Sequence, residues 1–145
     1  METEKSWKYG IAWDDNLNTG NDKVDEQHKT LYQLTSDLIE SSMKGESKEK
    51  IGERLDFLAN YTIDHFAYEE KLMLGTDYPD FAAHEKKHCD FKSAVTELID
   101  DYKTRGSTDE LSKNLENTVV KWLVRHIQGE DIKIAAHVRE KNKHQ

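Results

Sequence analysis

The sequence has few of the residues that interrupt regular structure or cross-link a chain. Its 145 residues include one cysteine, Cys89, one proline, Pro79, and seven glycines. A single cysteine excludes an internal disulfide, and a reducing cytoplasm is the simplest compartment for such a chain. Sparse proline and glycine favour long, uninterrupted elements of secondary structure. We interpret Cys89 as a small packing residue.

Long apolar runs and basic clusters are also missing. No run approaches the roughly 20 apolar residues that span a bilayer, and residues 1–5 lack the basic and apolar regions of a signal peptide. The formal net charge is −8 and no Lys/Arg cluster stands out, which argues against nucleic acid and against an anionic membrane surface as partners. We therefore expect one cytoplasmic domain over residues 1–145 that binds neither.

Apolar residues recur at helical spacing along four segments. We expect helices from about Asp22 to Met43, from after Ser47 to about Leu74, from just after Pro79, and from Ser107 until Gly129 breaks the last one. Ser47 is a predicted N-cap, and Ser107 with Glu110 is a predicted capping box. Four helices of about 20 residues with short connections predict an all-α, up-down-up-down four-helix bundle over 22–128. Residues 1–21 should form an arm packed over the bundle, and 129–145 a short helix and tail.

Histidines and carboxylates lie in phase with the apolar stripes of these helices. The set comprises His28, His65, Glu69, His84, His88, His126 and Asp131. Residues four apart share one helix face, so His65 with Glu69, and His84 with His88, can each reach a common site. Burying so many polar groups without compensation would be costly against a total stability of about 5–15 kcal/mol. Metal coordination satisfies them together, and the pattern therefore predicts a metal centre.

Asp131 is the one member whose spacing does not suit a straight helix. It lies five residues after His126, and we expect a break at Gly129 to bring it back toward the others. Imidazole suits iron, zinc and copper, while carboxylates favour harder ions and readily bridge two metals. The absence of cysteine ligands argues against a structural zinc or iron–sulfur site. The remaining histidines, His137 and His144, should be exposed.

Four motifs together resemble the hemerythrin family, specifically its single-domain prokaryotic members. They are Val24-Asp25-Glu26-Gln27-His28, His65-Phe66 followed by Glu69-Glu70, His84 with His88, and His126 with Asp131. The resemblance covers most of the chain and fills the seven ligand positions of the family in order.

The resemblance implies two non-haem iron ions joined by an oxo or hydroxo bridge. By the family pattern, His84, His88 and His126 would bind one iron, His28 and His65 the other, and Glu69 and Asp131 would bridge both. This count leaves one coordination position open, on the second iron, for dioxygen. The resemblance also implies an oxygen pocket walled by Phe66, Trp122 and Leu123. Gln27 and Glu70 are next to ligands in the sequence; a solvated position on the helix face is the commoner outcome for such residues, and a hydrogen bond to a ligand is the alternative.

The function implied by the resemblance is reversible dioxygen binding without catalysis, for transport, storage or delivery to an oxygen-using enzyme. An oxygen or redox sensor is an alternative, although no signalling module is visible. A di-iron enzyme acting on peroxide or nitric oxide, or a ferroxidase, is another. Ferritin-like enzymes use two Glu-x-x-His pairs, whereas only Glu85 with His88 has this spacing here. Metal storage, or a bundle held together by structural zinc, is a third class of function, and metal analysis would distinguish it from the others.

Overall fold

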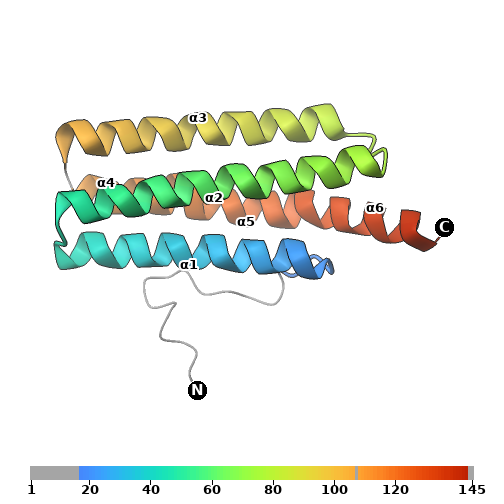
Figure 1. Ribbon diagram of the computed structural model, residues 1–145, viewed down its shortest axis with the longest axis horizontal. Coiled ribbons are helices and arrows are strands. Elements are labelled where there is room, and N and C mark those ends of the chain that lie inside the picture. The colour runs from blue at the N-terminus through green and yellow to red at the C-terminus, as the bar shows by residue number, and fades with distance from the viewer. Residues whose placement is uncertain (1–16, 107, 144–145) are drawn as a thin grey trace, which may run out of the picture.

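The computed structural model describes residues 17–106 and 108–143, which contain helices and no strand. Three long helices lead into a fourth, longer rod of consecutive helical turns (Figure 1). They are α1 (Asp22–Lys44), α2 (Lys48–Gly75), α3 (Phe81–Arg105), and then, without interruption, α4 (Thr108–Asn114), η3 (Leu115–Val120), α5 (Lys121–His126), η4 (Ile127–Asp131) and α6 (Ile132–Lys143), where η marks a π-helix. Successive rods run in opposite directions, which confirms the predicted all-α, up-down-up-down bundle.

Local side-chain chemistry sets the ends of the first two helices. The Asn21 side chain accepts a hydrogen bond from the backbone N–H of Val24 and begins α1. Gly45 ends α1 at φ 73°, a left-handed conformation that glycine adopts without steric cost. The predicted N-cap is confirmed, because the Ser47 hydroxyl accepts from the N–H of Lys50 at 3.2 Å. Ser107 of the predicted capping box and most of the predicted arm, residues 1–16, lie outside the described residues.

The break expected at Gly129 is wrong. Gly129 lies inside η4, is not among the glycines with positive φ, and is followed directly by α6. Glycine in a helix costs only about 1 kcal/mol relative to alanine. Burial of Ile134 and Val138 of α6 against Met73 and Tyr78 at the α2–α3 connection offsets this cost. The C-terminal helix therefore continues the fourth rod.

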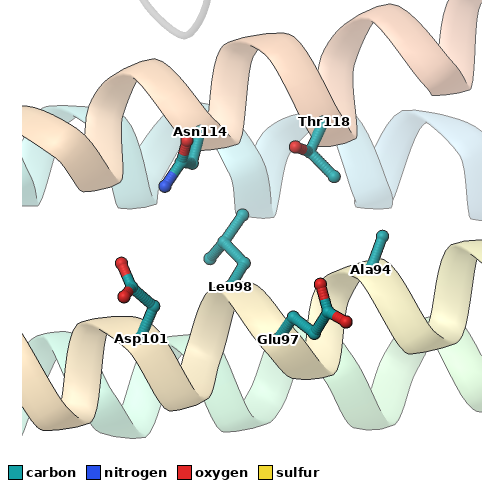
Figure 2. Close-up of a pocket in the computed structure, with 6 residues that line it drawn as sticks. All are labelled: Ala94, Glu97, Leu98, Asp101, Asn114 and Thr118. Atoms are coloured by element: carbon teal, nitrogen blue, oxygen red, sulfur yellow. The ribbon is translucent and has the colours of Figure 1, made fainter.

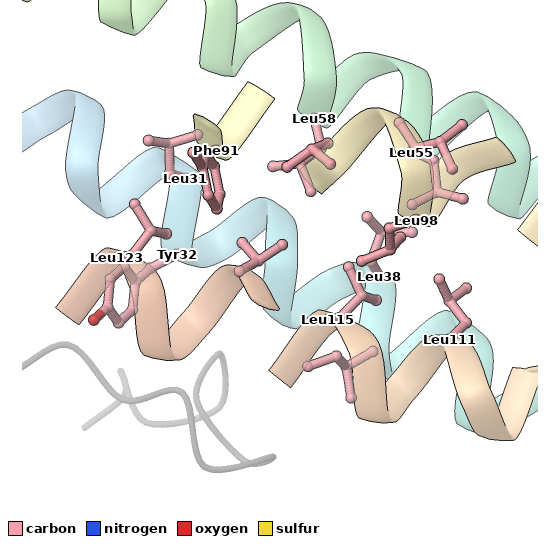
Figure 3. Packing of buried hydrophobic residues seen from close by; sticks show 14 of the residues in the cluster. Leu31, Tyr32, Leu38, Leu55, Leu58, Phe91, Leu98, Leu111, Leu115 and Leu123 are labelled. Carbon is pink, nitrogen blue, oxygen red and sulfur yellow. The ribbon is translucent and has the colours of Figure 1, made fainter. Parts of the chain in front are cut away.

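Two hydrophobic clusters fill the interior. The main core contains leucines from all four rods that point toward one another (Figure 3); those labelled are Leu31, Leu38, Leu55, Leu58, Leu98, Leu111, Leu115 and Leu123. The end core consists of Met73, Tyr78, Ile134 and Val138. On α2, His65 and Glu69 fall between Leu58 of the main core and Met73 of the end core. The predicted metal ligands therefore occupy a polar layer between two apolar ones.

Two surface features complete the fold. Cys89 is exposed, so its interpretation as a packing residue is wrong. It follows the inward-pointing His88 by one residue, which turns it about 100° toward solvent. Among the described helices, none combines the length and the apolarity that a bilayer crossing requires.

Candidate metal centre

All seven predicted ligand side chains lie inside the bundle. His126 is 5% exposed, and the other six are 2% exposed or less. Their ligand atoms form two overlapping groups in which all atoms lie within 4.8 Å of one another. One group is Glu69, His84, His88, His126 and Asp131, and the other is His28, His65, Glu69 and Asp131. The two carboxylates belong to both groups.

A π-helical turn brings Asp131 to the site. In η4 (Ile127–Asp131) the backbone bonds follow an i→i+5 pattern, so residues five apart share a face. His126 Nε2 consequently lies 3.1 Å from Asp131 Oδ1. The signal for this turn was present in the sequence as the five-residue spacing of two metal-binding side chains. The same spacing also suits a helix break at Gly129, which the structure does not contain.

Each carboxylate directs one oxygen toward each group. Asp131 Oδ2 is 2.9 Å from His28 Nε2, and its Oδ1 is 3.2 Å from His84 Nε2. Glu69 Oε2 is 3.2 Å from His65 Nε2, and its Oε1 is 3.2 Å from His88 Nε2. This arrangement is the one that two bridging carboxylates would require.

These short contacts leave many polar atoms unsatisfied. Among the described residues, both oxygens of Glu69 and of Asp131, and Nε2 of His28, are buried without a contact that has hydrogen-bond geometry. A buried polar atom without a hydrogen bond costs about 1–3 kcal/mol. Cations among these atoms would satisfy the carboxylates and the imidazole lone pairs together. Five imidazoles and two carboxylates, without thiolates, fit iron.

The electrostatics of the site favour positive charge. Burial alone lowers the pKa of His28, but the adjacent carboxylates of Asp131 and Glu69 outweigh burial and raise this pKa to about 9; the same balance raises the pKa of His84 to about 9. Burial raises the pKa of Glu69, yet His65, His28 and His84 hold it well below its usual range. In the metal-free protein, protons therefore balance part of the carboxylate charge. Metal ions must displace these protons when they bind.

Two polar side chains outside the ligand set hold ligand rings in place. Nδ1 of His65 bonds to Gln27 Oε1 at 2.7 Å, and Nδ1 of His88 bonds to Glu70 Oε2 at 3.0 Å. Since these atoms can only accept, the ring nitrogens donate and Nε2 of each ring faces the carboxylates. The sequence offers these contacts only as the alternative to solvated helix-face positions, and the structure shows both of them.

Glu70→Ala should weaken metal binding about 10–100-fold, because His88 loses the acceptor that fixes its ring and its tautomer. The measurement is calorimetric titration of the metal-free protein with Zn²⁺. Glu70→Gln, which keeps an acceptor oxygen, should recover most of the affinity. Glu85→Ala, at an exposed position on α3, the helix that carries His88, is the matched control. Equal affinity in Glu70→Ala and Glu85→Ala would contradict this role.

Two of the three residues predicted for an oxygen pocket stack on ligand rings, and the third is buried in the main core. Phe66 is 1% exposed and stacks on the His88 ring, with centroids 3.8 Å apart and planes 5° apart. Trp122 is half-buried and stacks on His126, and Leu123 is buried in the main core. An apolar, aromatic wall thus borders the polar layer, and its role toward dioxygen stays a prediction.

A separate groove lies away from this centre. It has a volume of about 410 Å³ and runs between α3 and the α4–η3 part of the fourth rod (Figure 2). Its lining residues are Ala94, Glu97, Leu98, Asp101, Asn114 and Thr118. The polar side chains of the two sides face one another across it. None of these residues is a predicted metal ligand or pocket residue, so the groove does not belong to the metal centre.

The prediction that His137 is exposed is wrong. Its side chain is half-buried, its Nε2 donates to the Thr76 carbonyl oxygen at 2.6 Å, and its ring meets that of Tyr78 edge-on at 5.2 Å. The cause is the uninterrupted fourth rod, which carries α6 back against the α2–α3 connection. His144 lies outside the described residues.

Comparison with known proteins agrees with the resemblance seen in the motifs. Residues 19–138 match the family model described as hemerythrin HHE cation binding domain. Bacteriohemerythrin from Stenotrophomonas maltophilia (strain R551-3) is 35% identical over 132 residues, 89% of this chain and 82% of the relative. Bacteriohemerythrin from Pseudomonas paraeruginosa is 34% identical over 83% of this chain and 76% of the relative. Myohemerythrin from Theromyzon tessulatum is 32% identical over 83% of this chain and 88% of the relative.

Proposed function

This chain belongs to the hemerythrin family, and from this membership we propose that it binds dioxygen reversibly at a non-haem di-iron centre. The observation that carries the proposal is the pair of overlapping ligand groups that share Glu69 and Asp131. We propose that three histidines hold one iron, two hold the other, and the two carboxylates bridge them beside an oxo or hydroxo bridge. Bound there, the two iron ions would supply the two electrons that dioxygen takes up.

The two metal positions differ in the number of histidines that the chain offers to each. The group with His84, His88 and His126 offers three imidazoles, and the group with His28 and His65 offers two. With the carboxylates shared, the second position has one protein ligand fewer. We propose that dioxygen binds on this side, where the chain leaves a coordination position open.

The surrounding residues keep water and protons away from the centre. Phe66 is 1% exposed, Leu123 3% and Ile127 0%. An apolar wall would exclude the water and external protons that convert an oxygen-binding iron site irreversibly to its oxidised form. We propose that the apolar layers on both sides favour reversible binding over turnover, for transport, storage or delivery to an oxygen-using enzyme.

Absorption spectroscopy of the anaerobically reduced protein tests the proposal. Air should convert a colourless form to a coloured one, removal of oxygen should restore the colourless form, and metal analysis should find two irons per chain. Irreversible oxidation without a reversible coloured form would overturn the carrier function and favour a redox sensor or a di-iron enzyme. Rapid turnover of peroxide or nitric oxide would identify the enzyme.

Leu123→Asn should accelerate autoxidation at least about tenfold, a change of about 1.4 kcal/mol in the barrier. Leu123 is 3% exposed and precedes His126 by three residues on α5, so an amide there brings a proton donor and attracts water. The loss of the oxygenated form is followed by absorption after aeration. Leu123→Met, which keeps the site apolar, should autoxidise at nearly the original rate. An unchanged rate in Leu123→Asn would remove Leu123 from the proposed wall.

A further inference from the structure

Trp122 stacks on the ring of a predicted ligand. Its indole lies face-on against the His126 ring, with centroids 4.2 Å apart and planes 14° apart. Trp122 itself stacks on Phe91, at 4.1 Å and 18°, and meets the edge of Phe66 at 5.9 Å. Since Trp122 precedes His126 by four residues on α5, the helix places one ring directly over the other. The indole is therefore fixed by two aromatic neighbours while it covers His126.

His126 lacks the hydrogen bond that holds two of the other rings. His65 and His88 are fixed through Nδ1 by Gln27 and Glu70. The polar contacts of His126 to described residues all involve Nε2, at 3.0 Å from His84 Nε2 and 3.1 Å from Asp131 Oδ1. Within that part of the chain, no side chain or carbonyl accepts from its Nδ1. Rotation of an imidazole about χ2 is soft, so this ring needs another restraint to keep Nε2 aimed inward.

We propose that Trp122 is the positioning residue for His126 and that ring stacking replaces the missing hydrogen bond. The inference rests on the proposed function, because it assigns Trp122 a role toward the metal that His126 would bind. Stacked aromatic pairs favour this near-parallel arrangement. A stacked indole restricts the tilt of the imidazole plane and leaves its edge, with Nε2, directed at the site.

The geometry also restricts where the effect is felt. His126 belongs to the group with Glu69, His84, His88 and Asp131 and not to the group with His28 and His65. Loss of the stack should therefore lower the metal affinity of one of the two positions and leave the affinity of the other unchanged. A residue that merely filled space in the bundle would weaken both positions through a general loss of stability.

The test is a Co²⁺ titration of the metal-free protein, followed by the visible absorption of the bound ion and by calorimetry. The original protein should bind two Co²⁺ per chain. In Trp122→Leu one of the two should bind about tenfold more weakly, with the other within about twofold of its original affinity. Trp122→Phe, which keeps an aromatic face over His126, should recover the first affinity to within about threefold. Proton NMR gives a readout independent of metal, because the ring-current shift of the His126 protons should persist with phenylalanine and vanish with leucine.

Three results would overturn the inference: two unchanged affinities in Trp122→Leu, equal weakening of both, or no recovery in Trp122→Phe. Circular dichroism of the metal-free variants establishes that each is folded. If Trp122→Leu does not fold, Trp122→Met, whose unbranched and flexible side chain adapts to irregular space without a planar face, takes its place with the same expectations. Failure of the proposed function looks different. Two Co²⁺ with the expected variant pattern but no reversible dioxygen binding by the iron form would refute the carrier and leave the role of Trp122 intact.

Discussion

Glu69→Gln should reduce bound iron from two ions per chain to fewer than one. Glu69 is 0% exposed and is one of the two residues shared by both ligand groups. The substitution keeps the shape of the side chain but removes one of only two negative charges that face the cations. Removal of one partner from a buried charge pair costs roughly 3–5 kcal/mol, which corresponds to an affinity loss on the order of 10²–10⁴-fold. Because both positions use Glu69, both should be affected.

Iron content after anaerobic reconstitution and desalting measures this loss. Glu97→Gln is the matched control, because Glu97 is exposed in the groove of Figure 2 and lies outside both ligand groups. It should retain two irons. Glu69→Gln with two tightly bound irons would show that Glu69 does not bridge the metals. Loss of one iron, with the other retained at full affinity, would mean that Glu69 binds the metal at only one of the two positions.

The metal centre was predictable from sequence because its chemistry is periodic. His65 with Glu69 and His84 with His88 are four residues apart, so helix geometry alone places each pair on one face. Each pair also continues an apolar stripe, which indicates that the face is buried. The adjacency of Gln27 and Glu70 to ligands places their side chains near the site, but the ring that each one contacts lies on a neighbouring helix and is set by the packing of the rods.

Features that depend on contacts between rods were not predictable in this way. A π-helical turn and a helix break both accommodate the five-residue step from His126 to Asp131, and only the packing of Ile134 and Val138 in the end core selects the turn. The same packing buries part of His137, whose spacing from other residues carries no signal. The stack of Trp122 on His126 lies within one helix, but its significance appears only when two of the other ligand rings, His65 and His88, are seen to be held by hydrogen bonds at Nδ1.

Removal of the metal should lower the midpoint of thermal unfolding by about 8–16 °C near neutral pH. A ligand that binds only the folded state at 1,000 times its dissociation constant contributes about 4.1 kcal/mol. Each kcal/mol corresponds to about 2–4 °C for a chain of roughly this size. The measurement is thermal unfolding followed by circular dichroism, with metal-loaded and chelator-treated protein compared in one buffer. Equal midpoints would mean that the buried ligand layer is satisfied without metal.

The difference in unfolding midpoint between the metal-loaded and the metal-free protein should widen as the pH rises from about 6.5 to above 9. In the metal-free protein the pKa of His28 and of His84 is raised from 6.5 to about 9 by Asp131 and Glu69, after burial is overcome. A raised folded-state pKa contributes stability that is fully present below 6.5 and is lost as the pH passes about 9. The metal-loaded protein has the opposite dependence, because protons compete with metal for the same nitrogens and rising pH removes the competitor. Unfolding midpoints of both forms at pH 6, 7.5 and 9 measure the trend. A difference that stays constant or narrows would mean that protons do not occupy this site when metal is absent.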